Sequence, residues 1–512
     1  FSAKAAVGFG TALRNDLFRH INSLSYREID TIGTSTLITR MTSDINQVQS
    51  GVNLVLRLFL RSPFIVFGAM IMAFQVNVRA ALIFVVAIPL LSIVVFGILL
   101  ISMPLYKKVQ KQLDRVLLTT RENLLGARVV RAFNRQQDEM KKFDEENSLL
   151  VNSQVFVGKI SALMNPVTYV IVNGATIILI WTGAWQVEGG IITQGAVVAL
   201  VNYMSQILVE LVKLANLIIT ISKSLACANR ISAVFEETSS IEDKADAAVL
   251  AANAGDAQEQ PAKVEFASMD FAYAGSSENA LSQISFQAMR GQTIGIIGGT
   301  GSGKSTLVNL IPRFYDATGG RVLVDGVNVK DMPFQALREK IGIVPQKAVL
   351  FKGTLRDNIR WGKPDATDEE IYHALEIAQA RDFVDSKDEG LDLMIQQGGK
   401  NLSGGQKQRL TIARALVRNP EILVLDDSAS ALDFATDAAL RKAIRENTKD
   451  MTVFLVSQRA TTIKNADQIL VLDDGNLVGR GTHKELLDTC EVYREICFSQ
   501  LSEKEVREHA EA

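Results

Sequence analysis

The stretch Gly298-Gly299-Thr300-Gly301-Ser302-Gly303-Lys304-Ser305-Thr306 decides the fold of the C-terminal half of this chain. It fits the pattern G-x-x-x-x-G-K-[ST], in which glycines let the backbone curl so that its N–H groups face a phosphate. The apolar, β-branched run 293–297 precedes the loop, and the helical run 307–311 follows it. Strand, glycine loop and helix N-terminus together predict a nucleotide-phosphate site rather than a chance glycine-rich turn.

Further residues of a nucleotide site follow downstream. In the loop itself, we expect Lys304 to reach the β- and γ-phosphates and the Ser305 hydroxyl to bind Mg²⁺. The apolar run 421–427 reads as a strand that ends in two carboxylates, Asp426 and Asp427, which is the usual Mg²⁺ side of such a site. A further strand, 341–346, ends in the amide of Gln346.

A second phosphate cradle is predicted at Leu402-Ser403-Gly404-Gly405-Gln406, directly before a helical run from Lys407 to Val417. A serine and two glycines at a helix start present backbone N–H groups to an anion. One γ-phosphate does not need two cradles on the same chain. We therefore expect each chain to lend its second cradle to the loop of another chain.

Charge and cysteine content restrict the possible function classes. The chain has 512 residues, 47% of them hydrophobic, and a net charge of -2, so no overall charge points to a nucleic-acid partner. The three cysteines, Cys227, Cys490 and Cys497, form no C-x-x-C pair and no metal pattern. Buried thiols in a reducing compartment are the expected reading.

The N-terminal half contains four long windows without any charged residue. They lie between Arg61 and Arg79, Arg79 and Lys107, Lys159 and Glu188, and Glu188 and Glu210. Each is long enough for a membrane span of about 20 residues, and so many windows are not typical of core helices in a soluble protein. We predict spans at about 55–78, 80–106, 163–186 and 194–222.

Basic residues set the predicted orientation. The segment Lys107–Lys159 is rich in Lys and Arg, which places it in the cytoplasm, and it reads as two long helices with a turn between them. The turn Ala127–Phe133 combines basic and apolar residues, and we expect it to dock on another domain rather than form a solvated helix face. The predicted domains are a transmembrane domain at 1–235, a linker at 236–262, an ATP-binding domain at 263–502 and a tail at 503–512.

Two charges interrupt the last apolar window. Glu210 and Lys213 stand three residues apart on a helix that is otherwise apolar from Ala196 to Ile221. They could line a substrate path, because charges at this depth usually face a cavity or a partner. They could equally form an i,i+3 pair near the inner interface, and the sequence leaves both alternatives open.

The motifs together resemble those of an ABC exporter subunit, in which a membrane domain is fused ahead of an ATP-binding domain. The resemblance rests on the glycine loop, Gln346 as the Q-loop residue, the LSGGQ sequence at Leu402–Gln406, a Walker B strand ending at Asp426 and a D-loop at Ser430-Ala431-Leu432-Asp433. It covers nearly the whole chain. It implies an all-α polytopic membrane domain followed by an α/β P-loop NTPase domain.

The resemblance also assigns roles along the membrane half. The region from Arg27-Glu28-Ile29-Asp30 through Thr42-Ser43-Asp44 resembles the first intracellular coupling segment, and Val130–Phe133 resembles the second, which in the family reaches the partner's ATP domain. The family has six spans in each subunit. The windows match the last four, so the first span and most of the second are expected to lie outside this sequence.

The resemblance implies the following site residues. Tyr273 matches the aromatic residue that stacks on adenine, and a plain core tyrosine is the alternative. The implied ATP-binding residues are Tyr273, Gly298, Gly299, Thr300, Gly301, Ser302, Gly303, Lys304, Ser305, Thr306, Ser403, Gly404, Gly405 and Gln406; the Mg²⁺ ligands are Ser305, Gln346 and Asp426; and the catalytic residues are Asp427, Gln458 and Gln346.

The chain departs from the family at two catalytic positions. The residue after the Walker B aspartate is normally a Glu that acts as the base, and here it is Asp427; the switch histidine is replaced by Gln458. Loss of a positioned base costs about 10²–10⁴ in rate, and glutamine cannot become a cation. Rather than two tolerated conservative changes, the pair predicts a site that binds ATP but turns it over slowly, as in the degenerate subunit of heterodimeric multidrug exporters.

The resulting expectation is an ATP-dependent translocase subunit that uses ATP and Mg²⁺, spans the plasma membrane several times and has a cytoplasmic ATP domain. It would pair with a non-identical second subunit and export small hydrophobic or amphipathic compounds, such as drugs, across the lipid bilayer. One alternative is a homodimeric lipid or peptide exporter. Another is an ATP-gated regulator or channel that pumps nothing.

Overall fold

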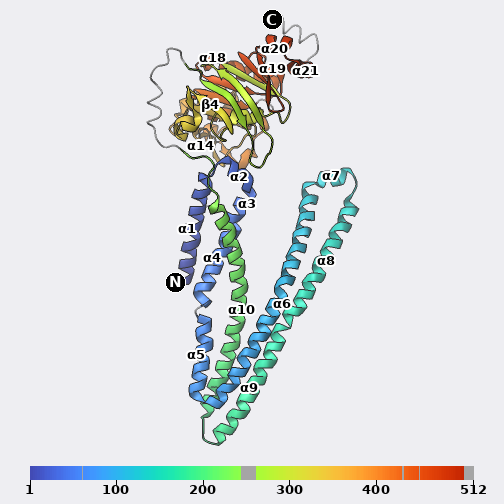
Figure 1. Cartoon of the computed structure of the whole chain (residues 1–512), viewed down its shortest axis with the longest axis vertical. Helices are drawn as coiled ribbons and strands as arrows, with labels where there is room; N and C mark the ends of the chain where they lie inside the picture. The colour runs from blue at the N-terminus through green and yellow to red at the C-terminus, as the bar shows by residue number, and fades with distance from the viewer. Residues whose placement is uncertain (60, 244–260, 429–431, 449, 501–512) are drawn as a thin grey trace. The chain divides into compact units, whose positions relative to one another are not determined.

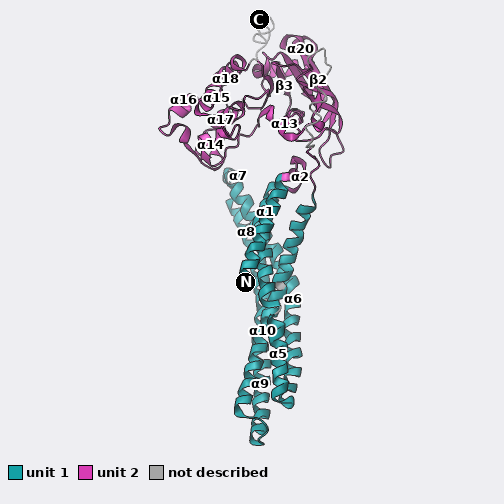
Figure 2. Cartoon of the chain, turned by 90° about the vertical axis from the view of Figure 1, so that its left-hand side faces the viewer, with its two compact units in different colours: residues 1–22, 33–237 teal, residues 23–32, 238–512 magenta. Residues whose placement is uncertain are grey.

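The computed structural model describes residues 1–59, 61–243, 261–428, 432–448 and 450–500 (Figure 1). The chain divides into two compact units (Figure 2). The first comprises Phe1–Asn22 and Gly33–Glu237, and the second comprises Ser23–Ile32 and Thr238–Ala512. The fold class expected from the sequence is confirmed, since helices build the first unit and a mixed sheet with helices builds the second.

The first unit is made of helices only, within the described residues. They are α1 (Ser2–Ser23), α3 (Thr34–Thr39), the π-helix η1 (Arg40–Asp44), α4 (Ile45–Leu54), the π-helix η2 (Val55–Phe59), α5 (Arg61–Val76), α6 (Val78–Leu125), α7 (Ala127–Ala132), α8 (Gln136–Ala162), α9 (Met164–Glu188) and α10 (Gln194–Glu236). α6 and α8 run side by side and are joined by α7 (Figure 1).

Four helical stretches among the described residues are long and apolar enough to cross a membrane. They are Thr34–Val76, Val78–Leu125, Gln136–Glu188 and Gln194–Leu214. Each overlaps one of the predicted spans, although the bounds differ, because a charge-free window of this length is stable in hydrocarbon only as a helix that satisfies its own backbone hydrogen bonds.

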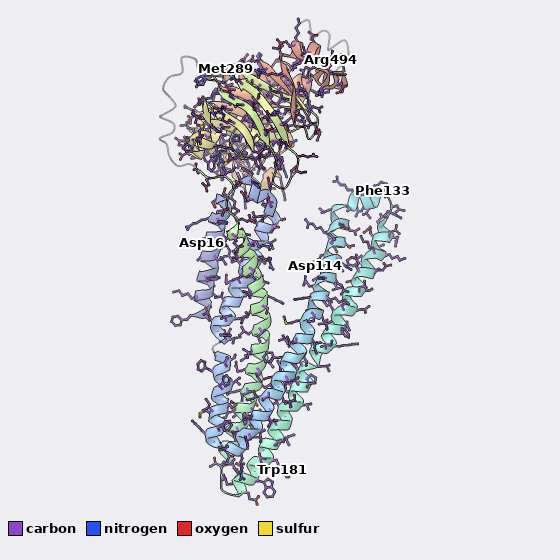
Figure 3. All side chains as sticks on the ribbon, viewed as in Figure 1. Asp16, Asp114, Phe133, Trp181, Met289 and Arg494 are labelled. Carbon is purple, nitrogen blue, oxygen red and sulfur yellow. The ribbon has the colours of Figure 1, made fainter. Side chains whose placement is uncertain are left out.

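Small residues bring these helices together. Ala73, Ala80 and Ala81 are fully buried around Phe84 and Leu179 in the core of the first unit. Small side chains let helix backbones approach closely, which is the usual packing solution where lipid removes the hydrophobic driving force. Large apolar side chains point outward instead, as Trp181 does with 68% of its surface exposed (Figure 3).

The two charges in the last apolar window form an i,i+3 pair, which is one of the two alternatives that the sequence leaves open. Lys213 Nζ lies 2.9 Å from Glu210 Oε1, and the Ser62 hydroxyl of α5 donates to Glu210 Oε2 at 2.6 Å. The Glu210 carboxylate is therefore buried between two helices with both oxygens bonded. A role in lining a substrate path stays a prediction.

The turn between α6 and α8 exposes apolar and basic side chains together. Val129 is 60% exposed and Phe133, at the tip of the hairpin, is 74% exposed (Figure 3). Such large exposed apolar side chains beside Arg131 suit a docking surface. Docking of this turn on another domain remains a prediction.

The second unit is built on one mixed sheet of ten strands, in the order β5-β4-β1-β2-β12-β11-β3-β10-β9-β6. The strands are β1 (Val264–Phe271), β2 (Leu281–Ala288), β3 (Thr293–Gly298), β4 (Gly319–Val324), β5 (Val327–Asn328), β6 (Ile341–Val344), β9 (Ile422–Asp426), β10 (Thr452–Val456), β11 (Gln468–Asp473) and β12 (Asn476–Gly481). A separate two-stranded sheet pairs β7 (Gly353–Thr354) with β8 (Met394–Ile395).

Helices and short 3₁₀ turns complete this unit. They are α2 (Tyr26–Ile32), α12 (Lys304–Asn309), η3 (Val329–Asp331), α13 (Phe334–Glu339), α14 (Leu355–Arg360), α15 (Asp368–Ile377), α16 (Arg381–Asp385), η4 (Gly390–Asp392), η5 (Gln397–Gly399), α17 (Gly404–Leu416), α18 (Phe434–Asn447), α19 (Ala460–Ile463), α20 (His483–Thr489) and α21 (Glu491–Gln500).

The centre of the sheet is parallel. The strands β6, β9, β10, β3 and β11 are parallel to one another in that order, as is typical of strands with buried, continuously apolar sequences. Parallel strands end at one edge, so the loops after β3, β9 and β10 meet there. The residues that the sequence predicts for the glycine loop, the Mg²⁺ side and the switch position lie in these loops.

A cluster of charged side chains surrounds the buried Lys263, the residue directly before β1. The Lys263 side chain is only 1% exposed, and its ammonium pairs with Asp325 Oδ1 at 2.7 Å and with Glu421. Lys340 lies 2.5 Å from the other Asp325 oxygen. The cluster therefore ties the residue before β1 to the β4–β5 turn and to the starts of β6 and β9.

We predict that Lys263→Ala destabilises the ATP-binding unit by about 2 kcal/mol, because it removes a buried cation from Glu421 and leaves Asp325 with Lys340 as its remaining partner in the cluster. Arg381→Ala is the control, since its bond to Glu376 joins side chains that are 48% and 63% exposed and is worth under about 1 kcal/mol. Thermal unfolding of both variants measures the difference. An equal loss in the two variants would show that the cluster contributes no more than a surface pair.

Candidate nucleotide-binding site

The glycine loop joins β3 to α12. Gly301 and Gly303 have φ angles of +86° and +93°, which residues other than glycine rarely adopt. Gly298 lies so close to β11 that a Cβ there would be 2.1 Å from the Leu472 carbonyl oxygen. The loop can follow this path only because glycine occupies these positions.

Lys304 begins α12 and folds back over the loop. Its ammonium donates to the Gly298 carbonyl at 3.0 Å and to the Gly299 carbonyl at 2.5 Å. Burial lowers the pKa of Lys304, and the nearby Asp427 and Asp426 carboxylates act in the opposite direction. A cation is thus held inside the loop, where the sequence predicts that phosphates bind.

Ser305 and Asp426 meet at the predicted metal side of the site. The Ser305 hydroxyl donates to Asp426 Oδ1 at 2.9 Å. Burial raises the pKa of the Asp426 carboxyl above its ordinary value, while the Ser305 bond opposes that shift. A hydroxyl and a carboxylate are the hard oxygen ligands that suit Mg²⁺, which also takes ligands from nucleotide phosphates. Ser305, Asp426 and the Gln346 amide oxygen are the residues that would hold it.

Asp427 and Gln346 are also brought together. Gln346 Nε2 donates to Asp427 Oδ2 at 3.3 Å, although the two residues lie on different strand ends. Asp427 has a φ of +46°, and its N–H donates to the Val456 carbonyl at 3.1 Å, so its backbone turns toward β10. Gln458 follows that strand, and its side chain is exposed. The three predicted catalytic residues therefore come from loops at the same sheet edge.

Tyr273 lies beside α12. Its hydroxyl hydrogen-bonds the Thr306 hydroxyl at 2.8 Å, and 42% of its surface is exposed. An exposed ring in this position suits stacking on a base better than a core role does. The stacking itself remains a prediction.

No motif or spacing in the sequence predicts the surroundings of Tyr273. The Tyr315 ring meets it edge-on at 5.6 Å, and the Tyr315 hydroxyl donates to Asp30 of α2 at 2.8 Å. These residues line a cavity of about 450 Å³. α2, which resembles a coupling segment, thus belongs to the same compact unit as the nucleotide residues. Asp30 and Tyr315 are 285 positions apart, so spacing could not have paired them.

The second cradle lies at the start of α17. The Ser403 hydroxyl accepts from the Gln406 N–H at 3.3 Å, and the Gln406 side chain accepts from the Ser403 N–H at 2.8 Å. This capping box fixes the helix start and leaves Ser403 and Gly404 exposed. The bonds made by these two side chains stay within the cradle, among the described residues, and do not reach the glycine loop.

The predicted D-loop is only partly visible. Ser430 and Ala431 lie outside the described residues. Leu432 is buried, and Asp433 caps α18 by accepting from the Thr436 N–H at 2.9 Å.

Comparison with known families assigns both units. Residues 1–211 match the ABC transporter transmembrane region, and residues 281–430 match the ABC transporter family. The chain is 37% identical over 500 residues to an uncharacterized ABC transporter ATP-binding protein, YfiB, of Bacillus subtilis, covering 98% of this chain and 85% of that protein.

Two relatives whose names state a function have a lower sequence identity to this chain. Identity is 34% to an ATP-dependent lipid A-core flippase of Desulfotalea psychrophila, covering 93% of this chain and 81% of the flippase. It is also 34% to a putative multidrug export ATP-binding/permease protein, YgaD, of Bacillus subtilis, with 94% and 82% covered. Among solved structures, a bacterial Atm1-family ABC exporter with ATP bound matches with a TM-score of 0.77 and 26% identity, covering 98% of this chain and 86% of that one.

We predict that Ser305→Ala weakens nucleotide binding about tenfold in the presence of Mg²⁺ and changes it little in EDTA, because only the metal contact of the hydroxyl is lost. Thr489→Ala is the control and should change neither value, because that hydroxyl donates to the Glu485 carbonyl of its own helix, away from the site. Fluorescent nucleotide titrations of the purified chain with and without Mg²⁺ make the measurement. Equal weakening in EDTA would contradict a metal-side role for Ser305.

Proposed function

Because this chain belongs to the ABC transporter family, with a transmembrane region ahead of its ATP-binding domain, we propose that it is one half of a heterodimeric exporter with a degenerate nucleotide site of its own. The chain is a multi-pass membrane protein, and its ATP domain is cytoplasmic, as is typical of the family. In this proposal its partner is a non-identical subunit that carries the hydrolytic site.

The observation that carries the proposal is the chemistry at Asp427 and Gln458. Asp427 is one methylene shorter than glutamate, which withdraws its carboxylate by about the length of a C–C bond, and proton transfer needs heavy atoms within about 3.2 Å. This carboxylate lies 3.3 Å from Gln346 Nε2, where it is an acceptor for the amide. Gln458 can donate a hydrogen bond but cannot carry the charge of an imidazolium.

Other residues of the site retain the groups needed to bind nucleotide. Lys304 and the loop N–H groups hold phosphates, Ser305 and Asp426 face the metal side, and Tyr273 lies beside α12. Ser403 and Gly404 are exposed at the start of α17 and available to a second chain. In the proposed complex, ATP trapped between two ATP domains closes them. Hydrolysis at the partner's site then resets the inward-facing state.

The proposed substrates are hydrophobic or amphipathic compounds, with drugs as the first class. Lipids are the second candidate, because the chain is as similar to a lipid A-core flippase as to a putative multidrug export protein, at 34% identity to each. The Glu210–Lys213 pair, in which only the glutamate is buried, leaves this choice open, because its charges already balance each other.

We predict that the full-length chain alone hydrolyses ATP slowly and that Asp427→Glu combined with Gln458→His raises its turnover at least about tenfold, because a base and an ionisable donor are restored. Phosphate release from the chain in lipid nanodiscs measures this. Adding Lys304→Ala to the double variant is the control and should abolish the gain. Brisk turnover by the parent chain, or no gain in the double variant, would argue against a degenerate site and favour a homodimeric exporter.

In the complex with its partner, we predict that Asp427→Ala lowers ATP-dependent uptake of a cationic dye into inverted vesicles less than twofold. Removal of the partner's base should lower it by about 10² or more. Equal losses would contradict the division of labour. Uptake of a labelled lipid but not of the dye would select the lipid class, and ATP-dependent conductance without uptake of either would indicate a channel.

A further inference from the structure

The turn after β10 is held by a side chain from the last described helix. Gln500 ends α21 (Glu491–Gln500), and its Nε2 donates to the main-chain carbonyl of Gln458 at 2.7 Å. Its Oε1 accepts from the N–H of Ala460 at 2.9 Å. One amide therefore bonds two backbone groups that lie on either side of Arg459.

Other bonds fix the same turn from the sheet side. The Ser457 N–H donates to the Ile296 carbonyl at 3.0 Å, and the Arg459 N–H donates to the Ser457 hydroxyl at 2.9 Å. α19 starts at Ala460, and its N-cap residue, Arg459, makes no side-chain cap bond. Gln500 provides the missing cap from outside the segment.

The helix that carries Gln500 is firmly anchored. Tyr493 and Cys497 are 0% exposed, and both belong to the main core cluster of the unit. Tyr493 also hydrogen-bonds His483 Nδ1 through its hydroxyl at 2.7 Å. Because α21 is fixed by this packing, the amide at its end can act as a rigid support for the turn.

We propose that Gln500 is a positioning residue for nucleotide turnover, which acts by holding the backbone of Gln458 so that its exposed side chain is aimed at the γ-phosphate. The proposal rests on the proposed function, in which Gln458 occupies the switch position. Gln500 acts through Gln458, because the bonds of its side chain go to backbone groups of the turn. None of the sequence motifs named above includes Gln500, so its role follows from the fold alone.

The two bonds should affect turnover more than affinity. Lys304 and Ser305, the residues predicted to bind phosphate and metal, both lie at the start of α12, and their side-chain bonds go to the glycine loop and to Asp426 rather than to the turn. Without Gln500, the carbonyl of Gln458 and the N–H of Ala460 exchange their fixed partner for water, and the turn samples more conformations. A smaller fraction of these conformations then aims the Gln458 side-chain amide at the γ-phosphate.

The first test is kinetic and uses the full-length chain in nanodiscs, both as the parent and as the Asp427→Glu/Gln458→His variant. Gln500→Leu should lower kcat about tenfold, the size expected for two hydrogen bonds, and leave KM for ATP within about twofold. Ser499→Ala is the control, because its hydroxyl bonds only the Ile496 carbonyl of its own helix. Gln500→Glu keeps the acceptor for Ala460 but loses the donor to Gln458, and should also lower kcat.

The second test separates positioning from general stability. Amide hydrogen exchange over 457–464 should be faster in Gln500→Leu than in the parent, with exchange in the sheet and the thermal midpoint unchanged. Unchanged kcat and local exchange would overturn the proposal. So would a uniform rise in exchange with a lower midpoint, since that is a purely structural role.

The outcomes for Gln500 and for the degenerate site are distinguishable. Brisk ATP hydrolysis by the parent chain would contradict the degenerate site, yet the ratio of kcat between Gln500→Leu and the parent would still test the positioning role. A kcat ratio of one in whichever chain is active would overturn only the positioning role.

Discussion

The hydrogen bond between Ser305 and Asp426 is the contact on which the nucleotide site depends. It joins the first turn of α12 to the end of β9, across a parallel sheet in which β10 lies between β9 and β3. Only this strand order brings the glycine loop, the two aspartates and the turn after β10 to one edge. Both groups are largely enclosed, so the bond also satisfies polar atoms that would otherwise be costly to bury.

The sequence predicted the fold class and the residues at this edge because local chemistry determines both. Glycines at positive φ, apolar strands that end in carboxylates and long charge-free helices leave few alternatives. The contacts of Asp30 with Tyr315 and of Gln500 with Gln458 could not be predicted in this way. They join residues far apart in sequence, and no motif or periodicity links them. The π-helices η1 and η2 were also not predicted, since nothing in their residues marks a departure from the α-helical period.

The two phosphate cradles have different surroundings, and this difference supports a composite site. Lys304 is buried under its own loop and bonded to carbonyls of that loop, whereas Ser403 and Gly404 stand exposed at the start of α17. The capping box bonds the N–H groups of Ser403 and Gln406 and does not use those of Gly404 and Gly405, the first two residues of α17, so the helix N-terminus can still face an anion. A pre-ordered, exposed helix start is suited to complete a site on a second molecule, which is the arrangement that the proposed function requires.

In the turn after β10, the bonds that hold the backbone of the switch residue are different from the side-chain groups that would carry its chemistry. Its backbone is bonded to the sheet through Ser457 and to α21 through Gln500, and neither bond involves the side chain at position 458. The side chain can therefore be histidine or glutamine without a change in the scaffold that presents it. On this view a hydrolytic site can lose its chemistry while keeping its geometry. That is the physical condition for a chain that still closes on ATP but leaves hydrolysis to its partner.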